Sequence, residues 1–497
     1  MENIIKYISS RVDSIGTKHK DYWIVSSVLL LLFSAIILFR YPDLILFPRF
    51  WAEEVIYFET FFHGNSWLLG FDKLVYPSYY NFLSRLAGFF ASLVGLEFAP
   101  IVTTIVGFLV LIAPIVIIFM TDSRYWSRLK DRIVLSLFLI FSCSTGEIWL
   151  NSTNLHFILP ITSFLILLDD NLSSKVKKLF YSLLIGIGSL TGPITLLMSP
   201  LFFLRYLYTK NKQYAIYCSI LFVFGSLHVA YYLINKDLGM MATSRLGINT
   251  GSSEQAISMI SNNVIFPLFG YFSSIVFRTF IGIVDVGIEN TPYLMYLNNS
   301  LPTVLFEFVE SVFSFFHEAG LIIKVVVFLL LSVFIYFQFK RSSADSRLFF
   351  IFPFIYLSVA TSLLSLGGIG GFRYSYITGF ILLFYLYNQM STTKMEHEKK
   401  YLRYVLTISI VVGILEYHPR MISYTSNDWP IWKEEVGLWR SDSEHNPLIW
   451  PSVKKSNGLW PKRTSIWYVD LNKPRYWNEY GNRRFSVEVE KYFSDGI

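Results

Sequence analysis

Two adjacent carboxylates are the strongest candidates for chemistry in this chain. Glu53 and Glu54 lie in the stretch Phe47-Pro-Arg-Phe-Trp-Ala-Glu-Glu-Val-Ile-Tyr-Phe58, directly after the first long apolar segment, with Arg49 and Trp51 beside them. Carboxylates near a membrane are costly to desolvate, so they commonly have a function. A carboxylate held among aromatic side chains can acquire the tuned pKa of a general base. The competing interpretation is an ordinary solvated loop.

Further polar residues lie near the ends of later apolar segments. They are Glu147, Asn151, Asn154, His156, Thr191, Arg373 and Tyr374. Asn151, Asn154 and His156 could bind a ligand or merely satisfy backbone groups of a turn. His156 suits a hydrogen bond better than a metal, because no second His or Cys lies at ligand spacing. Arg373 suits a phosphate, and snorkelling to the interface is its alternative.

The composition indicates an all-α polytopic membrane protein. Of 497 residues, 53% are hydrophobic and 15% charged, whereas soluble chains average about 25% charged residues. Apolar runs of near-spanning length recur through the chain. A net charge of +7 would suggest nucleic acid in a soluble protein. Here many basic residues fall in short loops between apolar runs, as the positive-inside rule expects, so no nucleic-acid partner is predicted.

The positions of the basic residues predict the topology. Residues 1–21 are basic and should be a cytoplasmic N-terminus, and the first apolar run should be a retained helix. We expect about 11 transmembrane helices, with the N-terminus inside and the C-terminus outside. The predicted spans are 22–39, 98–120, 133–150, 155–168, 179–192, 194–208, 214–234, 320–339, 348–366, 375–390 and 402–416. The apolar stretches 263–284 and 295–316 stay open between two spans and outer or re-entrant helices.

Three regions complete the predicted organisation. The transmembrane domain covers 22–416 and contains a long first outer loop, 41–97, in which 79–96 should be an interfacial helix. Span 155–168 gives only about 21 Å of helix against a hydrocarbon core of about 30 Å. Either the turn 151–154 before this span sinks below the membrane surface, or the bilayer thins. A sunken polar turn must be covered by protein or by a water-filled cavity. Residues 417–497 form a polar, Trp-rich outer segment.

The chain carries none of the common nucleotide or zinc motifs. No P-loop, dinucleotide fingerprint or zinc spacing is found in the sequence. Direct use of a nucleotide sugar or ATP is therefore disfavoured.

Four motifs together resemble a known superfamily. Phe50-Trp-Ala-Glu-Glu54 resembles the Phe-Trp-Ala-Glu-Asp type motif of GT-C integral-membrane glycosyltransferases, including O-antigen-modifying (serotype-conversion) glucosyltransferases. Gly146-Glu-Ile-Trp-Leu-Asn-Ser-Thr-Asn-Leu-His156, Leu190-Thr-Gly-Pro193 and Gly371-Phe-Arg-Tyr374 are similar to later motifs of that family, in the same order. The similarity covers most of the membrane part, and the Trp-rich tail is similar only in style.

The resemblance implies a GT-C-like fold and a glycosyl transfer on the periplasmic side of a bacterial inner membrane. The donor would be a hexose, glucose first of all, on polyprenyl phosphate, and the acceptor a lipid-linked glycan such as the O-antigen of lipopolysaccharide. Glu53 or Glu54 would deprotonate the acceptor hydroxyl, with inversion at the sugar. Arg373 and Arg49 would hold the donor phosphate. Membrane proteins that synthesise and flip the donor would be partners.

The motif departs from the commoner Glu-Asp-Gly form, because this chain has Glu-Glu-Val at positions 53–55. That departure leaves open which carboxylate is the base and whether a divalent cation bridges the two. No other cofactor is expected.

Two other functional classes remain alternatives. A flippase or transporter for lipid-linked glycans would place charges near the bilayer midplane and often show inverted repeats, whereas the charges here lie at the outer rim. An O-antigen polymerase or ligase would act on the same lipid-linked glycans. The Glu53–Glu54 pair directly after the first span disfavours that class without deciding against it.

Overall fold

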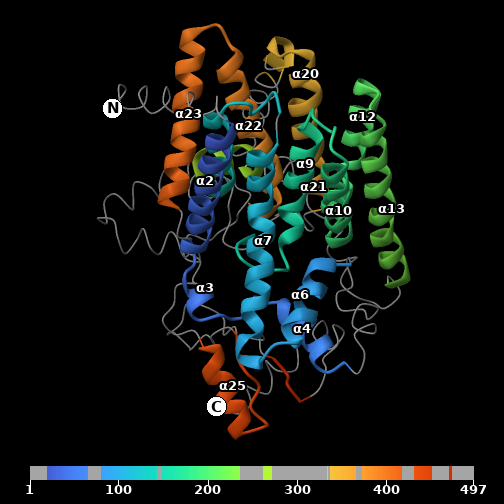
Figure 1. Cartoon of the computed structure of the whole chain (residues 1–497), viewed down its shortest axis with the longest axis vertical. Helices are drawn as coiled ribbons and strands as arrows, with labels where there is room; N and C mark the ends of the chain where they lie inside the picture. The colour runs from blue at the N-terminus through green and yellow to red at the C-terminus, as the bar shows by residue number, and fades with distance from the viewer. Residues whose placement is uncertain are drawn as a thin grey trace, which may run out of the picture.

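The computed structural model describes residues 19–64, 80–121, 123–142, 148–235, 261–270, 333, 336–337, 339–364, 372–416, 430–449 and 469–472. Within these ranges every regular element is a helix and no strand occurs, which confirms the all-α prediction for this part of the chain. The longer helices run along a common axis as a bundle (Figure 1).

The helices are given below in chain order. The first half of the chain forms α2 His19–Phe39, α3 Asp43–Leu46, α4 Glu54–Phe62, α6 Phe82–Ser92, α7 Ala99–Met120, α8 Leu129–Leu137, α9 Leu159–Leu168, α10 Lys175–Thr191, α11 Pro193–Leu196, α12 Ser199–Thr209 and α13 Lys212–Asn235. The second half forms α20 Ala344–Ser346, α21 Phe352–Leu364, α22 Tyr376–Thr392, α23 Glu396–Leu415 and α25 Trp432–Ser441. Short 3-10 and π helices are η1 Leu96–Phe98, η2 Phe138–Ser142, η4 Leu155–Phe157, η6 Ser261–Ile265, η8 Arg347–Ile351 and η9 Phe372–Ser375.

Helix α7 is the centre of the site-bearing half. It packs against α2, α6 and α9 and stands in the middle of the view in Figure 1. Its sequence is apolar almost throughout, and residues such as Leu111, Ile115 and Ile118 are buried. In water-soluble proteins, burying one such side chain contributes roughly 1.5–3 kcal/mol relative to leaving it exposed to water. The first turn contains Pro100, whose fixed φ suits a helix start.

Two glycines let the backbone of the site come close to its supporting helices. A Cβ added to Gly107 in α7 would lie 2.7 Å from the Asn151 nitrogen, and one added to Gly88 in α6 would lie 2.7 Å from the Tyr57 carbonyl carbon. Both distances are too short for any side chain. The turn at 150–151 therefore rests directly on α7, and α4 rests directly on α6.

Two helices in the described ranges are long and apolar enough to cross a membrane, Leu96–Met120 and Ala344–Thr361. Trp23–Phe39 and Leu155–Leu168 are shorter apolar helices. The predicted total of about 11 crossings and their orientation stay predictions.

Most predicted spans coincide with helices, and two differ at informative places. In the described part of the predicted span 133–150, α8 and η2 are helical, whereas Trp149 and Leu150 are not, with φ +52° at Leu150. The predicted span 194–208 is broken between α11 and α12. Pro200 in the first turn of α12 has no N–H to continue a helix from before it, which explains that break. Residues 271–332 lie outside the described ranges, so the predicted span 320–339 and the stretches 263–284 and 295–316 lie wholly or largely outside them.

Candidate active site

Glu54 lies at the start of α4, directly after a tight turn. Ala52, two residues earlier, has φ +30°, a conformation that L-residues rarely adopt. The Trp51 carbonyl accepts a hydrogen bond from the Glu54 N–H at 2.7 Å. Unusual backbone of this kind persists only where neighbouring structure holds it, and it is concentrated at functional sites.

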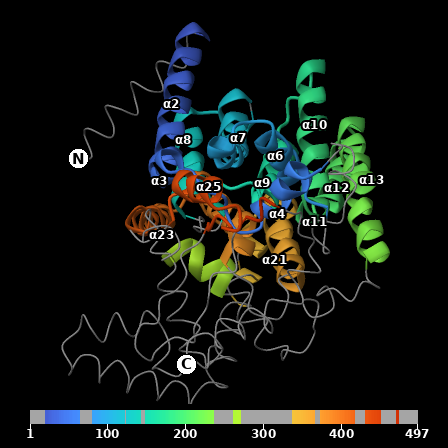
Figure 2. The same cartoon turned by 90° about the horizontal axis from the view of Figure 1, so that it is seen from below.

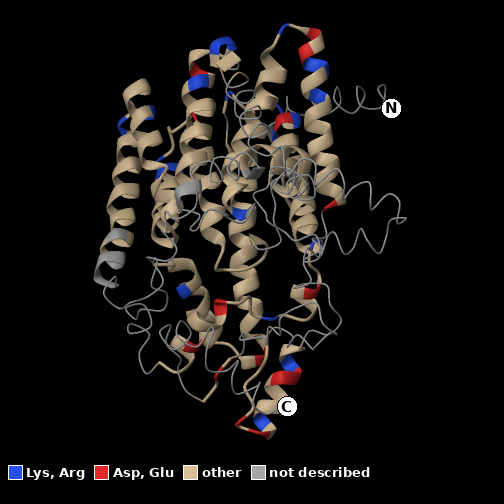
Figure 3. Cartoon of the chain, turned by 180° about the vertical axis from the view of Figure 1, so that it is seen from behind, with Lys and Arg blue, Asp and Glu red and all other residues tan. Residues whose placement is uncertain are grey.

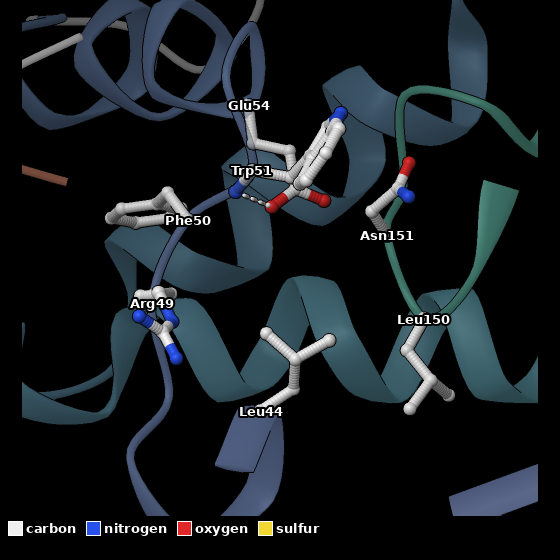
Figure 4. A pocket seen from close by; sticks show the side chains of 7 residues that line it. All are labelled: Leu44, Arg49, Phe50, Trp51, Glu54, Leu150 and Asn151. Atoms are coloured by element: carbon white, nitrogen blue, oxygen red, sulfur yellow. Dashed lines mark hydrogen bonds between the residues drawn. The ribbon is translucent and has the colours of Figure 1, made fainter. Parts of the chain in front are cut away.

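The Glu54 carboxylate is buried and accepts three hydrogen bonds from three different parts of the chain. Its Oε1 accepts from the Ser152 N–H at 2.5 Å. Its Oε2 accepts from the Trp51 N–H at 2.7 Å and from the Thr103 hydroxyl at 2.9 Å. Only 2% of the residue is exposed. The first loop, α7 and the turn after η2 therefore jointly fix one carboxyl group. Figure 4 shows the bond from Trp51 to Glu54.

Burial raises the pKa of Glu54 from 4.5 to about 7, even though the three hydrogen bonds act to lower it. Desolvation penalises the charged form and is the larger effect. A general base works best when its pKa is near the working pH. Glu54 thus has the electrostatic character of such a base. Its neighbour Glu53 is half-buried at the N-terminal boundary of α4 and does not line the pocket described next.

A small pocket opens beside this carboxylate. Its lining residues are Leu44, Arg49, Phe50, Trp51, Glu54, Leu150 and Asn151, and its free volume is about 10 Å³, which is room for about one water molecule. In Figure 4, Arg49 and Phe50 lie on one side of the Glu54 carboxylate and Asn151 on the other, with Leu44 and Leu150 along the floor. The structure therefore brings together four predicted site residues: Arg49, Trp51, Glu54 and Asn151.

The turn 151–154 is buried within the protein. Asn151 organises it, since its Oδ1 accepts from the Asn154 N–H at 3.0 Å and the Thr153 hydroxyl at 3.1 Å. Two residues at the start of α6 bind the turn. The Asn81 side chain donates to the Thr153 carbonyl at 3.1 Å, and the Ser84 hydroxyl donates to the Ser152 carbonyl at 2.8 Å. These bonds aim the Ser152 N–H at Glu54.

His156, Arg373 and Tyr374 gather at the far end of the same turn. The His156 Nδ1 lies 3.0 Å from the Thr153 carbonyl. The Arg373 guanidinium lies 5.7 Å from the ring centre of Phe157, and the Tyr374 ring meets Phe157 edge to face at 5.0 Å. The segment 151–157 therefore links the Glu54 carboxylate to Arg373.

The remaining predicted site residues are placed as follows. The Thr191 hydroxyl donates to the Ile187 carbonyl of its own helix at 2.7 Å and does not line the pocket. Glu147 lies outside the described residues. In the part of the chain that the structure places, no three His, Cys, Asp or Glu side chains are grouped so as to hold a metal ion.

Sequence reasoning did not single out Thr103, Ser152 or Glu59. Thr103 lies in an apolar run. The sequence signal for it was the presence of two adjacent threonines, Thr103 and Thr104, near the predicted outer end of that run. Ser152 contributes its backbone N–H, which no residue type reveals. Glu59 is fully buried five residues after Glu54 in the same helix.

This chain has little detectable similarity to known proteins. No family model matches the chain, and no curated protein matches it. Among solved structures, the chain is similar to the archaeal oligosaccharyltransferase AglB from Archaeoglobus fulgidus, solved in complex with an inhibitory peptide and a dolichol-phosphate. The identity is 12% and the TM-score 0.38, over 90% of this chain and 61% of that one. The chain thus spans less than two thirds of the length of that structure.

Proposed function

We propose that this chain is an integral-membrane glycosyltransferase of the GT-C type. It transfers a hexose, glucose first of all, from a polyprenyl-phosphate-linked donor to a lipid-linked surface glycan such as O-antigen. The reaction takes place on the periplasmic side of a bacterial inner membrane. The observation that carries the proposal is the buried Glu54 carboxylate, with three fixed donors and a pKa of about 7, beside Arg49.

In the proposed reaction, the acceptor loses a proton and the donor loses polyprenyl phosphate. Glu54 removes the proton of the acceptor hydroxyl as its oxygen attacks the anomeric carbon of the donor sugar. The bond from that carbon to the phosphate oxygen breaks, and polyprenyl phosphate leaves with the electron pair. Attack opposite the leaving group inverts the anomeric centre.

Fixed positive charge must stabilise the departing phosphate. Arg49 lines the Glu54 pocket, and Arg373 lies at the other end of the 151–157 segment. Guanidinium groups suit phosphate oxygens because they can donate two parallel hydrogen bonds. We assign both arginines to the donor phosphate, with Trp51, Tyr374 and His156 as sugar or lipid contacts.

The pocket volume limits what Glu54 can touch. The free space beside the carboxylate is about 10 Å³, which is room for about one water molecule. This space therefore admits the reacting hydroxyl of the acceptor, and the rest of both substrates lies outside it.

The test is transfer of radiolabelled glucose from polyprenyl-phosphate glucose to lipid-linked glycan by the purified full chain. Arg49→Gln and Arg373→Gln should each raise the KM for donor roughly 10- to 100-fold, since hydrogen bonds to charged groups are worth about 1.5–3 kcal/mol. Arg341→Gln, which breaks a solvent-exposed ion pair to Glu398, is the matched control and should transfer normally.

Two results would contradict the proposal. The first is movement of intact donor lipid across vesicles without any sugar transfer, which indicates a flippase. The second is joining of whole glycan repeats without use of the monosaccharide donor, which indicates a polymerase or ligase.

A further inference from the structure

The described parts of the C-terminal segment, 430–449 and 469–472, pack against the loop that carries Glu54. Trp432 in α25 is 2% exposed, and its ring meets Phe50 edge to face, with ring centres 5.3 Å apart at 81°. Phe50 is itself fully buried and lines the Glu54 pocket. Seen along the bundle axis, α25 lies between α3 and α4 (Figure 2). One layer of aromatic side chain therefore separates α25 from the candidate active site.

Helix α25 is also fixed to the start of α7. The Trp432 Nε1–H donates to the Leu96 carbonyl at 2.9 Å. Arg440, two turns further along, forms an ion pair with Glu97 in η1. Helix α7 carries Thr103, which donates to the Glu54 carboxylate. Helix α25 therefore contacts both Phe50 and the start of the helix that supplies this donor.

Residues 469–472 reach the other side of the loop. The Asp470 N–H donates to the Glu59 carboxylate at 2.8 Å, and His63 Nε2 lies 2.7 Å from the Asp470 carbonyl. A carbonyl can only accept, so the histidine ring donates in this bond. Glu59 is fully buried, and a buried carboxylate without partners is costly. This contact therefore fixes α4 beyond Glu54.

We propose that the C-terminal segment is a clamp that positions the Glu54 loop, with Trp432 as its main positioning residue on one side and the Asp470 backbone on the other. This inference rests on the proposed function, and it gives the Trp-rich segment a part in the same site. The clamp touches Phe50 before Glu54 and Glu59 after it, so it fixes both ends of the short stretch that carries the base.

Loss of the Trp432 ring should change the site in two ways. It frees Phe50 and the turn before Glu54, and misplacement of a reacting group by about 1 Å can cost 100-fold in rate. It also admits water beside a carboxylate whose pKa is raised by burial. Hydration favours the charged form, so the pKa of Glu54 should fall.

The first experiment is a series at one position. Trp432→Ala should lower kcat by about 10- to 100-fold and move the acid limb of the pH profile to lower pH. Trp432→Phe keeps an aromatic edge against Phe50 and should retain most of the rate. Leu438→Ala, at an exposed position of the same helix, is the control and should match wild type. A wild-type rate and pH profile for Trp432→Ala would overturn the inference.

A second measurement needs no activity. Phe50→Cys is placed in a chain that also carries Cys143→Ala and Cys218→Ala, and its labelling by a water-soluble maleimide is timed. Labelling should be slow with Trp432 present and at least about tenfold faster with Trp432→Ala, because the ring covers position 50. Equal rates would refute the clamp. Absence of transfer by wild type would refute the proposed function alone, since the labelling still decides the clamp.

Discussion

At the scale of single residues, the Thr103 hydroxyl can hydrogen-bond to Glu54 in both its charged and its neutral form. The Thr103 Oγ1 lies 2.9 Å from Glu54 Oε2 and 2.9 Å from the Pro100 carbonyl. A hydroxyl has one hydrogen to donate and lone pairs to accept. With Glu54 ionised, Thr103 donates to the carboxylate. With Glu54 protonated, the carboxyl can donate to Thr103, which then donates to Pro100. Thr103 can therefore hydrogen-bond to both protonation states of Glu54.

We therefore predict an acid limb in the pH profile near pH 7. Glu54 accepts a proton only when ionised, so the rate should fall about tenfold per pH unit below its pKa of about 7. Thr103→Val removes a hydrogen bond that favours the charged form, so the pKa should rise and the limb should move to higher pH. Thr103→Ser should keep the wild-type limb. The measurement is kcat/KM from pH 5 to 9, and a flat profile in wild type would contradict the assignment.

At the scale of elements, the sequence predicted the helices better than the turns between them. Apolar runs specify buried helices, and α7, α9, α13 and α22 lie where those runs predicted them. The geometry that aims Ser152 at Glu54 depends on Leu150 in a left-handed conformation and on close contact at Gly107. Neither leaves a periodic pattern in the sequence.

The choice between the two glutamates also lay beyond the sequence. Glu53 and Glu54 are neighbours of the same type, and the motif left both open as the base. The structure separates them because Glu54 is 2% exposed and accepts hydrogen bonds from three donors, whereas Glu53 is half-buried. This difference is the reason for proposing Glu54 as the base.

Substitution of Gly107 tests the supporting contact between α7 and the turn. A Cβ at Gly107 would lie 2.7 Å from the Leu150 carbonyl carbon, which is backbone and cannot swing aside. Gly107→Ala should displace the turn from Glu54 and lower kcat about 10- to 100-fold while the protein still inserts into membranes. Gly186→Ala is the control, because its Cβ would meet the Phe224 ring at an ordinary 3.4 Å. Equal activity of the two variants would show that the contact does not position the base.

At the scale of the whole molecule, the two ends of the bundle differ in charge. Lys and Arg gather toward the end opposite α25 (Figure 3). Ion pairs there join different elements, such as Arg205 of α12 with Asp170 at 2.5 Å and Arg124 with Asp345 of α20 at 2.7 Å. The Glu54 site, α6 and α25 lie at the opposite end (Figure 1). Under the positive-inside rule, this charge distribution predicts that the site faces the outer side of the membrane.

Cysteine accessibility in spheroplasts tests that orientation. In a chain with Cys143→Ala and Cys218→Ala, Gly95→Cys and Leu438→Cys should react with an impermeant maleimide added outside. Lys212→Cys and Lys394→Cys, exposed at the basic end, should react only after the membrane is opened. The reverse pattern would place the site in the cytoplasm and contradict the lipid-phosphate donor scheme.

The most direct test of the account compares Glu54→Gln with Glu53→Gln in the glucose-transfer assay at equal protein levels. Glu54→Gln removes the base and should lower kcat at least about 1,000-fold, within the range that general acid–base catalysis contributes. Glu53→Gln should stay within about fivefold of wild type, because that side chain does not line the pocket. Transfer by Glu54→Gln at the wild-type rate, or loss of transfer only with Glu53→Gln, would contradict the assignment of Glu54 as the catalytic base.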